Sequence, residues 1–308
     1  MNILKLGTCD LESSRLAYGC WRVAPTEEAG QTTGRDALLA AYEAGYTLFD
    51  HADIYGDGRA EAVFGQVLGE VSGMREAVSI ASKCGVRKAD DPTPGAPGRY
   101  DLSADHILRS CEASLRRLRI DTIDLYQLHR PDWLMNPEEV AGAFDQLRNQ
   151  GKVREFGVSN FTPSQVTALQ RACPMRLQVN QIEASLVHLA PFADGTLDQC
   201  LTEKLTPLAW SPLAGGLLAD GARRLLPSQQ GYETTTILKE INTLARLLHT
   251  SRGIVALAWL LKHPAGIVPL VGSTNPDKIR EAVEATHLNL SREEWYRLLE
   301  AARGEHLT

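Results

Sequence analysis

The segment GYTLFDHADIYG, residues 45–56, runs from an apolar strand pattern into a polar turn. The strand pattern ends at Asp50, and Tyr55 follows five residues later. Polar residues at the end of an apolar strand are typical of α/β barrels, in which the loops after the strands converge on one mouth and carry the functional side chains. The segment therefore predicts one βα unit with a functional end.

Two later segments have the same form. An apolar strand pattern ends at Lys83 in the first and at His129 in the second. Because successive strand residues alternate between faces, Lys83 shares its face with Ala81, and His129 shares its face with Gln127. Small and polar neighbours favour an inward face that lines a site. We therefore expect Asp50, Lys83 and His129 to meet at one end of the fold.

Short β-branched or apolar runs alternate with helical patterns along nearly the whole chain, which is the pattern of repeated βα units. Helix starts are indicated by Asn136-Pro137 and by capping boxes at Thr162 and Ser291. The predicted strands are Arg15–Gly19, Tyr46–His51, Ala77–Lys83, Thr122–His129, Val153–Val158, Leu177–Ile182, Thr206–Trp210 and Gly266–Val271. The stretches Arg87–Tyr100 and Gly215–Glu233 have the composition of loops. The eight strands favour a single (β/α)8 TIM barrel domain over residues 1–308, although an open doubly wound sheet shares the local pattern.

The bulk composition is that of an ordinary globular protein. Of 308 residues, 44% are hydrophobic and 23% are charged, and the formal net charge of −6 lacks the basic footprint of a nucleic-acid-binding protein. The start of the chain lacks the apolar core of a signal peptide, and no later run reaches the length of a membrane span, so we expect a cytoplasmic protein. The six cysteines lie far apart without a C-x-x-C pair, which predicts reduced, mostly buried thiols and no metal site.

Together, Asp50, Tyr55, Lys83 and His129 have the chemistry of a proton-transfer site. Reduction of a carbonyl requires a hydride at carbon and a proton at oxygen, and a phenol with a pKa near 10 is a poor acid at neutral pH unless its anion is stabilised. We expect Lys83 to lower the pKa of Tyr55, Asp50 to hold Lys83 in place, and His129 to donate a hydrogen bond that orients the carbonyl. The hydride must come from a cofactor, since no side chain supplies one.

Each of these residues also has an ordinary structural interpretation, such as a packed tyrosine, a solvated lysine or a turn-forming aspartate. Their joint placement on three consecutive strands favours the catalytic interpretation. A Rossmann dehydrogenase is disfavoured, because Gly56-Asp57-Gly58 begins a G-x-G-x-x-G signature but Glu61 stands at its third glycine. A Schiff-base lyase that uses Lys83 as its nucleophile is an alternative function, although this mechanism leaves Tyr55 without a role.

Six sequence blocks in this order resemble the aldo-keto reductase superfamily. They cover nearly the whole chain, and the D-H-A-D-I-Y-G and S-K-C-G blocks look most like those of little-characterised bacterial oxidoreductases. The blocks are residues 45–56, Ser82-Lys83-Cys84-Gly85, Leu128-His129-Arg130-Pro131, Gly157-Val158-Ser159-Asn160-Phe161, Asn180-Gln181-Ile182-Glu183 and Ala209-Trp210-Ser211-Pro212-Leu213. The resemblance implies a (β/α)8 barrel that reduces aldehydes or ketones to alcohols with NADPH, with Tyr55 as general acid.

The resemblance also implies roles for individual residues. Ser159, Asn160 and Gln181 would bind the nicotinamide carboxamide, and Trp210 would stack on the nicotinamide ring. The implied cofactor-binding residues are Gly19, Cys20, Trp21, Asp50, Ser159, Asn160, Gln181, Trp210, Ser211, Leu213, Gly215, Gly272, Ser273, Thr274 and Lys278. The implied substrate-binding residues are Trp21, Tyr55, His129 and Trp133.

Within that set, Ser273, Thr274 and Lys278 would hold the adenosine 2′-phosphate beside backbone amides of a helix that Asn275 caps. Many family members have a lysine where Gly272 stands and an arginine where Lys278 stands. Lysine still neutralises a phosphate, but it lacks the planar fork of arginine. The preference for NADPH over NADH is therefore a prediction that needs a direct test.

Three further expectations complete the resemblance. His51, where the family often has threonine, points away from Asp50 by strand alternation and is predicted to be structural. Few residues follow Ala302, so the long C-terminal specificity loop of some relatives is shortened, which predicts an open pocket and a broad range of carbonyl substrates. The superfamily includes channel-associated members that bind NADPH and turn over slowly, so a cofactor-sensing subunit is an alternative. The oligomeric state is not indicated.

Overall fold

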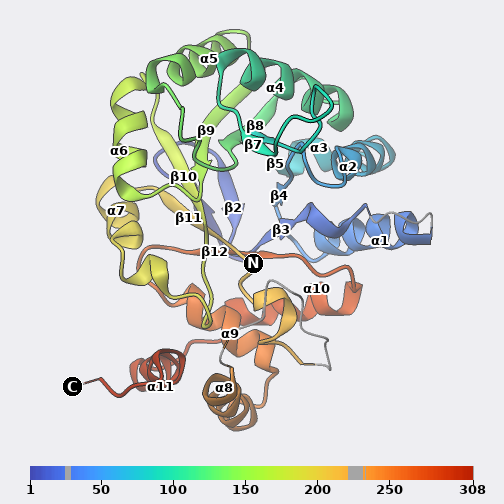
Figure 1. Cartoon of the computed structure of the whole chain (residues 1–308). Coiled ribbons are helices and arrows are strands. Elements are labelled where there is room, and N and C mark those ends of the chain that lie inside the picture. The colour runs from blue at the N-terminus through green and yellow to red at the C-terminus, as the bar shows by residue number, and fades with distance from the viewer. Residues whose placement is uncertain (25–28, 221–231, 233, 308) are drawn as a thin grey trace.

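The strands close into a barrel. The computed structural model describes residues 1–24, 29–220, 232 and 234–307. Eight parallel strands pair in the closed order β10-β11-β12-β3-β4-β5-β8-β9, and helices surround them (Figure 1). The barrel strands are β3 (Ala17–Gly19), β4 (Leu48–Asp50), β5 (Ser79–Cys84), β8 (Ile123–Leu128), β9 (Val153–Ser159), β10 (Leu177–Glu183), β11 (Thr206–Trp210) and β12 (Val268–Val271). Two hairpins add β1 (Ile3–Lys5) with β2 (Glu12–Ser14) and β6 (Val86–Arg87) with β7 (Arg99–Tyr100). The predicted (β/α)8 barrel is confirmed, and the open sheet is excluded.

Each predicted strand overlaps one barrel strand, and β11 has the predicted bounds. Five strands begin one or two residues later than predicted, and for two of them the reason is local. The backbone amide of Arg15 donates to the carbonyl of Asn2 beside the N-terminal hairpin, and β3 begins only at Ala17. Residues 74–77 form the short helix α3, so β5 begins at Ser79 rather than at Ala77.

The helices begin where the capping residues predict. The side chain of Asn136 accepts hydrogen bonds from two backbone amides at the start of α5, and the capping boxes at Thr162 and Ser291 are both formed. The α-helices of the described residues are α1 (Ala29–Glu43), α2 (Arg59–Glu70), α3 (Met74–Ala77), α4 (Ala104–Leu118), α5 (Pro137–Asn149), α6 (Pro163–Ala172), α7 (Thr196–Glu203), α8 (Thr235–Leu247), α9 (Arg252–Leu261), α10 (Pro276–Ala282) and α11 (Arg292–Arg303). Short 3-10 helices include η1 (Cys20–Arg22), η3 (Ala214–Gly216) and η5 (Val283–Thr286).

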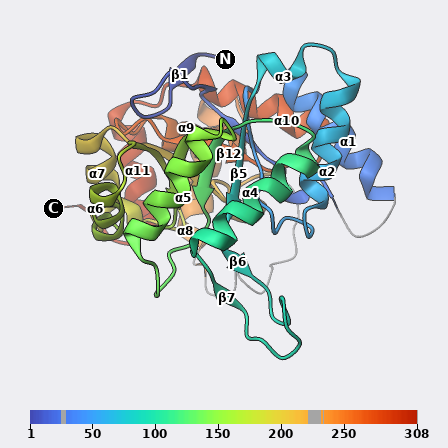
Figure 2. The same cartoon turned by 90° about the horizontal axis from the view of Figure 1, so that it is seen from above.

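The barrel interior is closed at one end by a hairpin that the sequence did not predict. Ala81 and Leu125 are fully buried inside the barrel, and Leu6 and Leu11 of the β1–β2 hairpin pack against the same cluster. The hairpin lies at the amino ends of the strands, where the amide of Ser14 donates to the Thr47 hydroxyl at 2.7 Å. Figure 2 shows β1 at one end of the molecule and the β6–β7 hairpin at the other. The carboxyl ends of the strands are thus left for a site.

Both predicted loops contain short elements. β6 and β7 pair where the stretch Arg87–Tyr100 begins and ends, so the loop prediction is wrong there. The Arg87 guanidinium holds this hairpin by ion pairs with Asp91 at 3.1 Å and Asp101 at 2.9 Å. In the stretch Gly215–Glu233, η3 overlaps the start, and residues 221–231 and 233 lie outside the described residues.

All six cysteines are free thiols, and five of them are buried, while Cys9 is half-buried. Within the described residues, no single helix is long and apolar enough to cross a membrane, and α8 and α9 meet that criterion only as a pair bent by 98°.

Candidate active site

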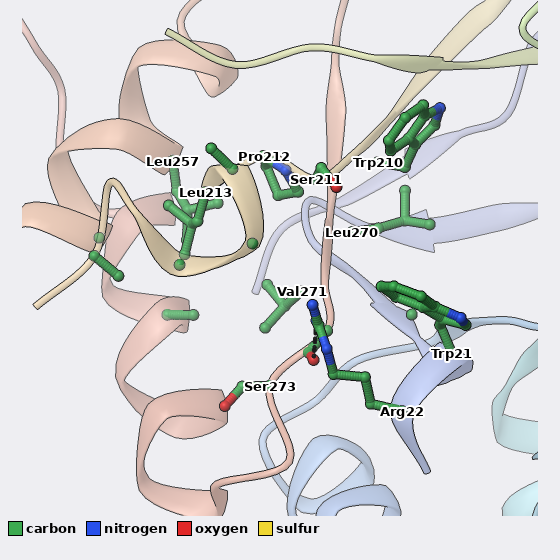
Figure 3. A pocket seen from close by; sticks show the side chains of 18 of the residues that line it. Trp21, Arg22, Trp210, Ser211, Pro212, Leu213, Leu257, Leu270, Val271 and Ser273 are labelled. Carbon is green, nitrogen blue, oxygen red and sulfur yellow. Dashed lines mark hydrogen bonds between the residues drawn. The ribbon is translucent and has the colours of Figure 1, made fainter. Parts of the chain in front are cut away.

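A cavity of about 560 Å³ opens at the carboxyl end of the barrel strands. The last residues of six strands line it, namely Gly19, Asp50, Ser159, Glu183, Trp210 and Val271. Figure 3 shows Trp210 and Trp21 at one side of this cavity, with Ser211, Pro212 and Leu213 along the neighbouring wall. Loops at this end of a barrel carry the functional groups, so the cavity lies where the sequence placed the four candidate residues.

The ammonium group of Lys83 joins three acceptors beneath this cavity. Its Nζ atom donates to Oδ2 of Asp50 at 2.7 Å, to the backbone oxygen of His51 at 2.7 Å and to Oη of Tyr55 at 3.1 Å. An ammonium has three donors, and all three are used. Lys83 is fully buried, so its charge is fixed directly below the phenol.

Asp50 is held on its other side by two glutamine side chains. Nε2 of Gln181 donates to Oδ1 of Asp50 at 2.8 Å, and Nε2 of Gln127 donates to the same oxygen at 3.4 Å. Both carboxylate oxygens therefore have partners. Gln127 was not among the predicted site residues, although strand alternation had placed it on the face of His129, which is the signal that identifies it.

Burial and neighbouring charges act in opposite directions on Lys83 and Tyr55. Burial lowers the pKa of Lys83, but the charges of Asp50 and Tyr55 and the hydrogen bonds to them outweigh it and place this pKa above its ordinary value. Burial raises the pKa of Tyr55, and the opposing effect of Lys83 is too small to reverse it. Lys83 thus acts in the expected direction, while the net pKa of Tyr55 lies above its ordinary value, because the phenolate is desolvated and Asp50 offsets the ammonium.

His129 faces Tyr55 across the floor of the cavity. The two ring centroids are 5.8 Å apart with an interplanar angle of 80°. Burial, and then the charges of Lys83 and Arg130, lower the pKa of His129 well below its ordinary value of 6.5. The imidazole is therefore neutral at physiological pH and carries a single N–H donor. The imidazole N–H and the phenol O–H are two neutral donors that can bind one carbonyl oxygen.

The residues predicted to bind a carboxamide lie together at the ends of β9, β10 and β11. Nε1 of Trp210 donates to Oδ1 of Asn160 at 2.9 Å, and Nδ2 of Asn160 donates to Oγ of Ser159 at 2.8 Å. The Asn160 backbone has φ of 62°, in the left-handed region that non-glycine residues rarely adopt. An amide oxygen accepts two hydrogen bonds, so Oδ1 of Asn160 can still accept one more. These groups fit a nicotinamide carboxamide.

Two cations lie at the far end of the cavity, where the carboxylate of Glu281 also lines the wall. Arg22 and Lys278 line it together with Gly272 and Ser273, and Nη1 of Arg22 donates to the backbone oxygen of Gly272 at 3.1 Å. Figure 3 shows the Arg22 side chain reaching the backbone beside Val271. Two cations among small residues are a donor set that fits phosphate groups. A phosphate-bearing dinucleotide thus suits this wall.

The expected contribution of the α10 backbone amides is not supported. The side chain of Asn275 accepts hydrogen bonds from the amides of Asp277 at 2.8 Å and Lys278 at 3.4 Å. The cap therefore uses the amides that were expected to face a phosphate. The Lys278 ammonium itself pairs with Glu281 at 2.7 Å.

Four predicted site residues do not line the cavity, which are Cys20, Lys83, Thr274 and Trp133. Cys20 is fully buried and belongs to the main hydrophobic core. Trp133 is 90% exposed, because the Asp132 side chain accepts hydrogen bonds from the amides of Leu102 and Leu134 and fixes the loop outward. Lys83 lies beneath the floor, and the other predicted residues all line the cavity.

Arg130 and Glu183 are two of the charged residues that line the cavity and that the sequence analysis did not predict. Arg130 follows His129, and its guanidinium carbon lies 5.4 Å from the centre of the Trp210 ring. Glu183 ends β10 and accepts a hydrogen bond from the Tyr232 hydroxyl at 3.3 Å. Both stand inside blocks that the family resemblance had singled out, so their position next to predicted site residues was the available signal.

His51 lies on the opposite face of its strand, as alternation predicts. Its ring is buried and packs 4.6 Å from the ring of Phe64. Burial, with a smaller effect of Lys83, lowers its pKa to about 3. The side chain is therefore neutral and structural.

A barrel with this site at its carboxyl end matches one enzyme family. The model of the aldo/keto reductase family matches residues 15–303, and the chain belongs to this family. It is 40% identical to the 6-dehydroglucose reductase of Novosphingobium aromaticivorans over 98% of the chain and 96% of that protein. It is 39% identical to the oxidoreductase YdhF of Escherichia coli over 95% of each. The holo form of aldo-keto reductase AKR11C1 from Bacillus halodurans has a TM-score of 0.81 at 26% identity, covering 98% of this chain and 96% of that one. The protein is therefore an oxidoreductase.

Proposed function

We propose that this protein is an NADPH-dependent reductase that converts aldehydes or ketones to alcohols. The observation that carries the proposal is the contact of one buried ammonium, that of Lys83, with both Asp50 and Tyr55 at the floor of the cavity. Membership of the aldo/keto reductase family, whose members use nicotinamide cofactors, supports it. When bound, the reduced nicotinamide supplies the hydride.

Tyr55 is the proposed general acid. Its raised pKa keeps the phenol protonated at neutral pH, so a proton is available for the carbonyl oxygen as negative charge develops there. Lys83 stabilises the phenolate that forms, because its ammonium already donates to Oη of Tyr55 at 3.1 Å. Asp50 keeps Lys83 charged and holds its ammonium group in position. Proton transfer and charge stabilisation thus come from one connected group of side chains.

His129 is the proposed orienting donor. Its imidazole is neutral, so with Nε2 protonated it donates to the carbonyl oxygen without competing as an acid. Its edge-on placement against the Tyr55 ring lets both groups reach one oxygen. Trp21 is proposed to contact the substrate from the cavity wall.

The cofactor contacts follow from the wall residues. Ser159, Asn160 and Gln181 bind the carboxamide, Trp210 packs on the nicotinamide ring, and Ser273 and Lys278 bind the 2′-phosphate. The substrates are small carbonyl compounds of broad range, and polyhydroxylated aldehydes are included because two relatives are named 6-dehydroglucose reductase.

A Schiff-base lyase is not favoured. A nucleophilic amine must lose a proton, but Lys83 donates to three acceptors and its pKa is raised. A cofactor-sensing subunit with slow turnover would have the same binding site, and measured turnover separates it from a reductase.

The test combines binding with turnover. NADPH and NADH are each titrated against tryptophan fluorescence, and reduction of a reactive aldehyde is followed by NADPH oxidation. We expect tighter binding of NADPH than of NADH, and a fall in kcat of about 100-fold or more in Tyr55→Phe with NADPH binding retained. Tyr100→Phe, on the exposed β7 strand, is the matched control and keeps full activity. Binding without turnover by the wild type would leave only the sensing role, and binding of neither cofactor would refute the proposal.

A further inference from the structure

Among the described residues, Arg130 differs from the other cations of the cavity in having no acceptor. Arg22 donates to the Gly272 carbonyl, and Lys278 pairs with Glu281. In the described part of the chain, the guanidinium of Arg130 has neither an ion pair nor a hydrogen bond, and its recorded contact is with the Trp210 ring.

This arrangement leaves the donors of Arg130 available to a ligand. The Trp210 ring covers a face of the guanidinium, while its five N–H groups lie in the plane of that group. Arg130 is half-buried in the cavity wall. A planar fork of this kind binds two neighbouring oxygen atoms better than one. The cavity therefore offers a site for a pair of oxygens next to His129.

Glu183 supplies the complementary acceptor. It lines the same cavity, and its side chain is 22% exposed. Arg130 and Glu183 have opposite charges but form no ion pair with each other in the described structure. A carboxylate ligand would be attracted by Arg130 and repelled by Glu183, whereas a hydroxyl both accepts and donates. The pair thus suits a neutral ligand with several hydroxyl groups.

Resting on the proposed reductase activity, we propose that Arg130 and Glu183 are specificity residues that select aldehydes with neighbouring hydroxyl groups. Arg130 donates to two hydroxyl oxygens, and Glu183 accepts from a hydroxyl further along the chain. The carbonyl stays at Tyr55 and His129. Selectivity for hydroxylated over plain aldehydes is then a property of these two side chains rather than of the proton-transfer group.

The test compares two aldehydes that differ only in hydroxyl groups, glyceraldehyde and propanal. In Arg130→Leu, the ratio of kcat/KM for glyceraldehyde to that for propanal falls by about 10- to 100-fold, the effect of removing a charged hydrogen bond. Arg130→Lys, which keeps the charge without the fork, gives an intermediate ratio. Glu183→Gln lowers the ratio as well. Arg171→Leu, a matched change of an exposed arginine on α6, leaves the ratio and both rates unchanged.

Three outcomes overturn the inference and leave the reductase proposal standing. One is an unchanged ratio in Arg130→Leu with NADPH binding retained. Another is an equal fall in kcat/KM for glyceraldehyde and for propanal in both Arg130→Leu and Arg130→Lys. The third is a wild-type preference for an anionic aldehyde, succinic semialdehyde over butanal, that Arg130→Leu abolishes, because Arg130 would then bind a carboxylate. Absence of turnover of every aldehyde by the wild type contradicts the reductase proposal itself and, with it, this inference.

Discussion

The Nζ atom of Lys83 lies 2.7 Å from Oδ2 of Asp50, and the exposed fractions of the two side chains are 0% and 2%. Removal of one partner from a buried ion pair leaves an uncompensated charge. We predict that Asp50→Asn lowers the free energy of unfolding by about 3 kcal/mol, measured by urea denaturation. Aldehyde reduction falls by about 100-fold in the same variant, because the burial that lowers the pKa of Lys83 is then less opposed.

The control for this prediction is the double variant Asp50→Asn with Lys83→Met. It contains neither charge, so we expect it to regain part of the lost stability while staying inactive. Stability losses that simply add in the double variant would show that the two charges are not coupled, contrary to the short contact.

The low pKa of His129 predicts an unusual pH profile. Since its pKa in the folded protein lies well below 6.5, the imidazole stays neutral as the pH falls through that value. The kcat for aldehyde reduction is therefore expected to be flat around pH 6.5, whereas an unperturbed histidine would produce an inflection there. The ring proton signals of His129, followed by NMR, give the direct measurement. An inflection near pH 6.5 that is absent in His129→Gln would contradict the prediction.

The barrel and the candidate tetrad were predictable because their signals are local. Strand alternation and the polar residues at strand ends are fixed by a few consecutive residues, and Asp50, Lys83 and His129 each lie within one residue of the end of β4, β5 or β8. The β1–β2 hairpin gave no such signal, since each of its strands has three residues. Its place depends on Leu6 and Leu11 entering the barrel, which is a tertiary event.

The features that the sequence did not reveal depend on the surroundings in three dimensions. The net pKa of Tyr55 is decided by burial, which no neighbouring residue in the sequence reveals. Trp133 has the residue type of a pocket wall, but the hydrogen bonds of Asp132 turn its loop toward solvent. The capping side chain of Asn275 was recognised, yet its use of the amides expected to face a phosphate was not foreseen.

The raised pKa of Asp53 predicts that the free energy of unfolding falls as the pH rises. Burial, and then the charge of Glu61, raise its pKa from 3.8 to about 7, and its Oδ1 atom is buried without a partner in the described structure. A carboxyl group with a raised folded pKa contributes stability below its unfolded pKa, and this contribution is lost as the pH rises from about 4 through 7. Asp53→Asn should therefore stabilise the protein by up to about 4 kcal/mol near pH 8 and have little effect near pH 4.

Urea unfolding at the two pH values measures this difference for Asp53→Asn. The exposed Asp121 provides the matched control. Asp121→Asn should change the free energy of unfolding only slightly, and by the same amount at both pH values. A stabilisation of Asp53→Asn that did not depend on pH would indicate better packing rather than the relief of a buried charge.

The Lys278 ammonium lies 2.7 Å from a carboxylate oxygen of Glu281, and both residues line the cavity where the 2′-phosphate is proposed to bind. Glu281 competes with a phosphate for this cation and also repels it. We therefore predict that Glu281→Gln strengthens NADPH binding by about three- to tenfold in a fluorescence titration, and that Lys278→Met weakens it by a similar factor. NADH binding stays nearly constant in both variants, because NADH lacks the phosphate. Glu284→Gln, a change of an exposed glutamate in η5, is the matched control and leaves both affinities unchanged. The gain in NADPH affinity should shrink at high salt, because screening weakens the repulsion that Glu281 exerts. Equal changes in NADPH and NADH affinity in Glu281→Gln would place the phosphate away from Lys278.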